Sequence, residues 1–278
     1  MTFWERNQLK LAPFFFLAPA ILIFLIYVIY PIFDSIWVSF HEWNGMDKSG
    51  LKKNGTPNWR WVGLQHYITL FTDDDEFYVS LFNNIRWLVF SLLAIPIGLS
   101  LALFVNQNIA GMRYIKSLFY FPFVINAVVI GVIFTWFYNP KYGALTLVLG
   151  FFGLDPIAFL ADENLATYGI IIASFFPGIA YTMILYITGL TGVNREMIEA
   201  GRIDGASGFT MLWHVVLPQL KPATLIAVVV TIVGALRSFD LIAVMTAGGP
   251  WGSSEAVSYT HLRAHETDSY LVCRLLLE

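Results

Sequence analysis

Residues 199–218 read EAGRIDGASGFTMLWHVVLP, a helix-sized stretch that combines charged residues with three glycines. Strongly apolar runs lie on both sides, at about residues 165–190 and 223–247. Each run is near the length that a tilted helix needs to cross about 30 Å of hydrocarbon. The stretch is therefore expected to be a polar loop between two membrane spans.

The composition indicates an integral membrane protein. Hydrophobic residues make up 57% of the 278 residues and charged residues 13%, about half the usual share in soluble domains. The net charge of −3 comes without a basic face, so nucleic acid is not an expected partner. Cys273 is the only cysteine and the histidines have no ligand spacing, so no metal site is expected.

The chain carries no motif for binding nucleotides or for hydrolysis. It lacks GxxxxGK[ST], GxSxG, and GxGxxG after a strand. We therefore expect no enzymatic activity and no cofactor in this chain. Any ATP and Mg²⁺ would be bound by another subunit.

Five apolar runs predict an all-α protein with spans at residues 11–33, 82–105, 118–138, 165–190 and 223–247. Residues 34–81 are expected to form an external loop. A cleavable signal peptide is an alternative for the first run, but the apolar residues continue beyond its Ala-Pro-Ala sequence at 18–20. Glycines, Asp155 and Pro156 interrupt residues 143–160, which favours a re-entrant or interfacial segment.

Basic residues near the spans favour an orientation with residues 1–10 in the cytoplasm. The loops with Arg6 and Lys10, with Arg113 and Lys116, and from Arg195 to Lys221 would then be cytoplasmic. Basic residues in the external loop weaken this count: Lys48, Lys52, Lys53 and Arg60. The acidic run at 73–76 is interpreted as a solvated turn, with a cation site as the alternative.

Residues 257–278, VSYTHLRAHETDSYLVCRLLLE, change abruptly to a charged composition without periodicity. The string resembles one reading frame of a transposase-type sequencing adapter, so we interpret it as not native and expect it to pack on nothing. A genuine tail is the alternative.

The spacing within residues 199–218 predicts two short helical pieces. Glu199 and Ala200 are placed on the first piece, and Gly205 allows a backbone conformation that bends the chain into the second. Pro218 is expected to end the second piece. Small residues throughout the stretch would leave a low surface for another protein. The alternative is an amphipathic helix that lies on lipid headgroups.

This stretch resembles the EAA loop of ABC importer permeases, whose pattern is EAA, three residues, Gly, nine residues, then Ile-x-Leu-Pro. Gly201 in place of Ala and Val215 in place of Ile are the departures. The resemblance implies an ATPase-coupling loop over residues 191–222, formed by Glu199, Ala200, Gly201, Asp204, Gly205, Val215, Leu217 and Pro218.

Other segments resemble the carbohydrate-importer branch of this family, among them FYFPFVINAVVIGVIFTWFYNPKYGALT and RSFDLIAVMTAGGP. The resemblance implies a multi-pass permease in a bacterial plasma membrane, with a sixth span missing after residue 255. Its implied partners are a second permease, two cytoplasmic ATPases, an external solute-binding protein, the solute and membrane lipid. The alternatives are a non-sugar solute (phosphate ester, polyamine or amino acid), a stand-alone secondary transporter, and a structural subunit.

Polar and aromatic residues within the spans are candidates for the solute path. Arg237 and Asp240 are three residues apart and are expected to share one face of the fifth span, as solute contacts or as an ion pair. Asn126, Trp136 and Tyr138 in the third span offer an amide and flat rings for a sugar. Packing and interface roles are the alternatives for the rings.

Overall fold

A computed structural model describes residues 3–43, 59–107 and 109–260, with the side chains of residues 3–11 excepted. The chain divides into two compact units, residues 1–74 and 75–278. Each unit is described by itself.

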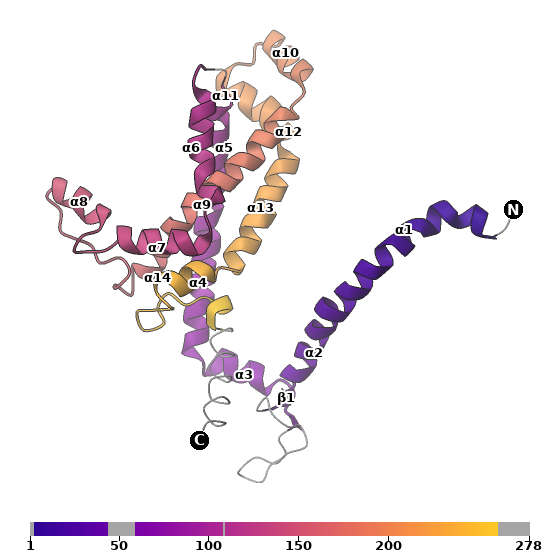
Figure 1. Ribbon diagram of the computed structural model, residues 1–278, viewed down its shortest axis with the longest axis vertical. Helices are drawn as coiled ribbons and strands as arrows, with labels where there is room; N and C mark the ends of the chain where they lie inside the picture. Colours follow the sequence, from indigo (N-terminus) through magenta and orange to yellow (C-terminus); the bar gives the residue numbers. More distant parts are fainter. Residues whose placement is uncertain (1–2, 44–58, 108, 261–278) are drawn as a thin grey trace. The chain divides into compact units, whose positions relative to one another are not determined.

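The first unit consists of a long apolar helical segment followed by a small aromatic region (Figure 1). The segment is a candidate span over Ala12–Ser39. Strand β1 pairs antiparallel with β2 in the register His41↔Trp61. Aromatic rings pack around this pair, with His41 stacked on Trp59 at a centroid distance of 4.2 Å. The elements are α1 (Phe3–Phe24), η1 (Leu25–Ile29), α2 (Tyr30–Ser39), β1 (His41–Glu42), β2 (Arg60–Trp61) and α3 (Gln65–Thr72).

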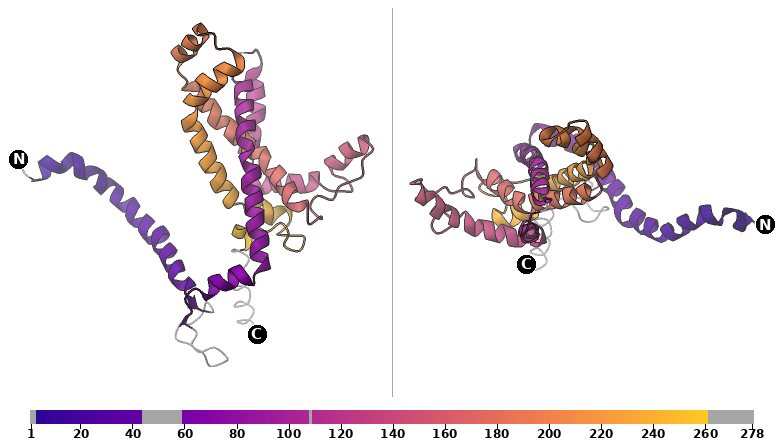
Figure 2. Two further views of the ribbon diagram at one scale, coloured as in Figure 1. Left: turned by 180° about the vertical axis from the view of Figure 1, so that it is seen from behind. Right: turned by 90° about the horizontal axis from the view of Figure 1, so that it is seen from above.

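The second unit is a bundle of apolar helices with a helical loop at one end (Figures 1 and 2). Three helical segments of the described chain are long and apolar enough to cross a membrane, or five if each bent pair forms one span. The elements are α4 (Asp75–Leu92), α5 (Ala94–Val105), α6 (Met112–Val124), α7 (Ala127–Phe137), α8 (Ala144–Phe151), α9 (Ala166–Thr191), α10 (Arg195–Ile203), α11 (Gly208–Met211), η2 (Leu212–Val216), α12 (Leu217–Gln219), α13 (Lys221–Leu236) and α14 (Asp240–Met245).

The third and fifth predicted spans are not straight helices. Helices α6 and α7 meet at 99°, because Ile125 and Asn126 are both extended between them. The pieces Gly208–Gln219 and Lys221–Leu236 meet at 73°. This second break lies just before the fifth predicted span. The span itself is interrupted after Leu236 and resumes as α14, so neither 118–138 nor 223–247 forms one uninterrupted helix.

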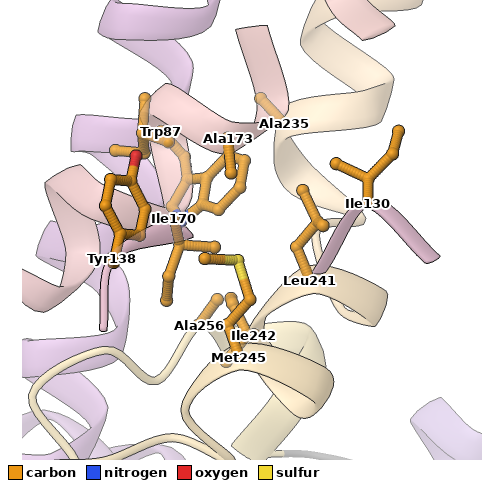
Figure 3. Close-up of a cluster of buried hydrophobic side chains, with 11 residues drawn as sticks. Trp87, Ile130, Tyr138, Ile170, Ala173, Ala235, Leu241, Ile242, Met245 and Ala256 are labelled. Carbon is orange, nitrogen blue, oxygen red and sulfur yellow. The ribbon is translucent and has the colours of Figure 1, made fainter. Parts of the chain in front are cut away.

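Two apolar clusters hold the second unit together. One cluster joins α4, α7, α9, α13 and α14, and Figure 3 shows its members, among them Ile170, Ala173 and Ile242. The other cluster includes Val105, Met183, Tyr186 and Leu220, nearer to α10. Small residues allow close helix contacts, as in other membrane proteins. A Cβ on Gly98 would meet the Thr182 side chain, so α5 and α9 approach each other through this glycine.

Residues at the start of the adapter-like string do pack on the second unit. The ring of Tyr259 stacks on Phe239 at 5.7 Å, and Ser258 Oγ donates to the carbonyl of Ser238 at 2.6 Å. The expectation that residues 257–278 pack on nothing is therefore wrong for 257–260. Residues 261–278 lie outside the described residues.

Candidate functional site

The loop between α9 and α13 begins with a capped helix, α10. Asn194 accepts a hydrogen bond from the Glu196 amide at 2.8 Å and so caps its first turn. Gly205 ends the helix with φ +84°, while Ala206 N donates to Gly201 O at 2.8 Å and Gly205 N to Arg202 O at 3.1 Å. These two bonds form a Schellman motif, which favours glycine at the left-handed position. The geometry thus explains the glycine at 205.

A second helical piece, Gly208–Gln219, folds back on α10. A Cβ on Gly201 would lie 3.1 Å from Val215 Cγ2 and 3.2 Å from Met211 Cε, so the pieces pack closely at this glycine. The two departures from the family pattern are therefore in contact. Gln219 connects the ends of the loop, since its Oε1 accepts from Asn194 N at 2.9 Å.

Pro218 lies inside α12, and the helix ends one residue later at Gln219. The preceding residues Leu212–Val216 form a wider π-helix, and Leu217 N donates to Leu212 O. A π-helical turn relieves the clash that a proline ring makes with the carbonyl four residues earlier. The predicted stop at Pro218 is therefore displaced by one residue.

The outer surface of the loop is both charged and apolar. Glu199, Asp204 and Pro218 are exposed, whereas Gly201 is buried. The ring of Phe209 stacks on Trp213 at 5.8 Å with both side chains exposed. Ile203 is 87% exposed. Phe209, Trp213 and Ile203 were not predicted as site residues from the sequence. Their position next to the small residues of the loop was the available signal. This surface would fit a partner protein that offers an apolar groove for the exposed rings and a basic group to pair with an acidic side chain.

A cavity of about 420 Å³ is lined by residues of α4, α5, α6, α7, α9, α13 and α14. Aromatic, hydroxyl and charged side chains line it together, and the rings of Phe123 and Tyr181 stack there at 5.5 Å. Small-molecule sites commonly combine such an apolar lining with a few polar groups. The polar and aromatic lining includes Trp87, Ser91, Phe123, Ser174, Tyr181, Thr231, Arg237, Ser238 and Asp240.

Two lining residues have buried polar atoms without a hydrogen-bond partner in the described part of the chain. They are Trp87 Nε1 and Ser238 Oγ. The Trp87 side chain is only 3% exposed, and Figure 3 shows it beside Ala173. Because a buried polar group costs free energy unless it is paired, these atoms favour a bound hydroxyl group or water. Sequence reasoning missed Trp87, since tryptophan in a span usually packs.

The structure brings only two of the predicted solute residues into this cavity. Arg237 and Asp240 both line it, and both are exposed residues. They do not share a helix face, because α13 ends at Leu236 and α14 begins at Asp240. Within the described residues they form no ion pair. Because of the break after α13, the cationic Arg237 and the anionic Asp240 line the cavity as separate charged groups.

The other three predicted solute residues lie outside the cavity lining. Asn126 Oδ1 accepts from Val128 N at 2.8 Å and caps α7. Trp136 is 56% exposed on α7. Tyr138 is buried, and its hydroxyl donates to Gly169 O at 3.1 Å. These contacts give Asn126 and Tyr138 a structural role.

A bundle of bent apolar helices with a partly polar cavity and a helical loop at one end defines a membrane transport protein. Residues 94–263 match the family described as binding-protein-dependent transport system inner membrane component. The chain belongs to this family. The resemblance to importer permeases that the loop indicated is confirmed.

Individual relatives agree with this assignment. The chain is 34% identical to the probable ABC transporter permease protein YurN of Bacillus subtilis (strain 168), covering 91% of this chain and 84% of the relative. It is 28% identical to the trehalose/maltose transport system permease protein MalF of Thermococcus litoralis, covering 91% and 82%. A crystal structure of a bacterial alginate ABC transporter, in complex with an alginate pentasaccharide-bound periplasmic protein, has a similar fold. Its TM-score is 0.77 at 21% identity, covering 96% of this chain and 87% of that one.

Proposed function

We propose that this chain is one of two permease subunits of an ATP-driven importer and forms part of the path for a sugar. The observation that carries the proposal is the α10–α12 loop, whose Schellman glycine and close packing present exposed charged and apolar side chains at one end of the unit. Two cytoplasmic ATPase subunits, which bind ATP and Mg²⁺, would seat on this loop. An external solute-binding protein would deliver the solute.

The distribution of charge in the second unit supports a cytoplasmic position for this loop and, with five spans, for the N-terminus. Basic residues gather at the α10 end: Arg113, Lys116, Arg195, Arg202 and Lys221. Acidic residues occupy the first turn of α4 and the segment before α9: Asp75, Glu76, Asp155, Asp162 and Glu163. This asymmetry follows the positive-inside tendency.

The cavity lining favours a neutral, hydroxyl-rich solute. Arg237 and Asp240 together contribute no net charge, so a phosphate ester would meet Asp240 and a polyamine would meet Arg237. Sugar hydroxyls can both donate to a carboxylate and accept from Arg237 or Trp87 Nε1. The stacked rings of Phe123 and Tyr181 offer flat apolar surfaces. Among the relatives, a trehalose/maltose permease favours a sugar, whereas an sn-glycerol-3-phosphate permease of equal identity makes a phosphate ester the competing solute.

The experiment is uptake of labelled sugars by the complete transporter in proteoliposomes, with maltose, trehalose and glycerol 3-phosphate as probes. Trp87→Phe keeps the ring but removes the buried Nε1–H donor, so we expect sugar uptake at subsaturating concentration to fall about tenfold. Trp136→Phe, on the exposed face of α7, is the matched control and should leave uptake unchanged. Equal uptake by both variants would show that the cavity is not part of the solute path. Transport of glycerol 3-phosphate but of neither sugar would exclude a sugar as the solute.

A further inference from the structure

Trp251 stands at the tip of the loop that follows α14, over residues 246–256. Its side chain is 94% exposed, although tryptophan is a large apolar residue. Its φ of +51° lies in the left-handed region that favours glycine. Trp251 thus combines an exposed ring with a backbone conformation that tryptophan rarely adopts.

Internal hydrogen bonds make the loop compact. Ser254 is fully buried, and its Oγ donates to Gly249 O at 2.6 Å and contacts Thr246 Oγ1 at 2.7 Å. Gly248, with φ +82°, leaves no room for a side chain, since a Cβ there would lie 2.8 Å from Glu255 Cγ. The tip that carries Trp251 is thus fixed from within.

Two buried side chains anchor the loop to the bundle. Asn83 of α4 is fully buried, and its Nδ2 donates to Ser253 O at 2.7 Å and to Glu255 O at 2.8 Å. Thr167 of α9 donates to Ser253 O at 3.1 Å. Buried hydrogen bonds of this kind are costly to break. The loop that carries Trp251 is therefore anchored to α4 and α9.

The surroundings of the loop are those of a water-facing surface. Asn83 lies two turns after Asp75 and Glu76 in α4, and Thr167 follows Asp162 and Glu163 closely. Ionised side chains are expensive in hydrocarbon, so this end of the unit projects into water. Figures 1 and 2 place it at the end opposite α10. Under the proposed function, this is the external side.

We propose that Trp251 is the anchor through which this subunit binds the external solute-binding protein. Tryptophan is enriched among the residues that dominate binding energy, and a loop held in its bound shape loses little entropy on association. The acidic residues nearby predict that the complementary surface is an apolar socket rimmed by lysine or arginine. The inference rests on the proposed function, because it requires a binding-protein-dependent importer.

The test uses the complete transporter in lipid nanodiscs, titrated with the sugar-loaded solute-binding protein of the same transport system while ATP hydrolysis is measured. Trp251→Ala should raise the concentration of binding protein that gives half-maximal stimulation by about tenfold or more. At saturating binding protein, the variant should reach the same maximal rate of ATP hydrolysis as the wild type. Trp251→Phe, which keeps a ring, should recover most of the affinity. Phe151→Ala, at an 86% exposed position of α8, is the control and should leave the titration unchanged.

Three outcomes would overturn the inference: an unchanged titration for Trp251→Ala, loss of the second permease subunit from that variant, and quenching of Trp251 fluorescence by brominated lipid. The second would assign the ring to a contact between permeases, and the third to the membrane interface. Failure of the proposed function is distinguishable, since the wild-type transporter itself would then show no stimulation by the binding protein.

Discussion

At the scale of single residues, Gly201 determines how closely the two pieces of the α10–α12 loop pack. The residue is buried, and a Cβ there would touch Val215 and Met211. Helix propensity alone favours almost any residue over glycine, by up to about 1 kcal/mol for alanine. The glycine is therefore explained by the contact with η2 and α11.

We predict that Gly201→Ile destabilises the loop by about 1–3 kcal/mol, because the branched side chain must displace Val215. The measurement is the thermal unfolding midpoint of the purified assembly, together with retention of the ATPase subunits. Ala200→Ile, one residue earlier and exposed, is the matched control and should change the midpoint little. Equal stability of the two variants would show that the contact does not constrain residue 201.

The residue scale also shows where sequence reasoning stopped. Gly205 could be placed at a bend because a family spacing and a conformational rule agree there. Trp87 and Ser238 could not be selected, since their unpaired atoms are visible only when α4 and α13 are brought together. Asn126 in a span suggested a solute contact, but its side chain is used by the adjacent helix end.

At the scale of elements, the break between α6 and α7 is the main departure from the predicted spans. An apolar run of the right length predicts a helix, but the run does not reveal a bend of 99° within it. Asn126 was the available signal, because asparagine is favoured at helix starts. The same limitation applies to the break after Leu236, where Arg237 and Asp240 had been placed on one helix.

We predict that Asn126→Ala weakens the start of α7 by about 1 kcal/mol, through loss of the bond to Val128 N. Asn126→Ser retains a capping oxygen, so it should restore sugar uptake and protein level where alanine lowers both. Uptake by the two variants, normalised to the amount of inserted protein, distinguishes the roles. If serine is as harmful as alanine, the amide contacts the solute and the capping account fails.

At the scale of the whole molecule, the second unit has a loop at each of two ends, and helices join the two ends. The α10–α12 loop lies at one end, and the loop that carries Trp251 lies at the other (Figure 1). Helices α9 and α13 connect them and also line the cavity. The class and the polar loop were predictable from the sequence, since composition and spacing decide them. The cavity was not, because it arises from bends that a run of apolar residues does not encode.

The central claim is that the α10–α12 loop couples an ATPase to the spans. Gly205→Val cannot easily adopt φ +84°, so the Schellman turn would open, whereas Gly205→Asn tolerates this conformation. Glu199→Ala removes an exposed charge from α10 without disturbing the turn. All three changes lie outside the spans, so membrane insertion should be preserved.

The most direct measurement is co-purification of the ATPase subunits with each variant, together with ATP hydrolysis stimulated by loaded solute-binding protein. The account predicts that Gly205→Val and Glu199→Ala are inserted at wild-type levels but lose the ATPase subunits or the stimulation, while Gly205→Asn retains most of both. Normal co-purification and normal stimulation of Gly205→Val and Glu199→Ala would contradict the coupling role of this loop.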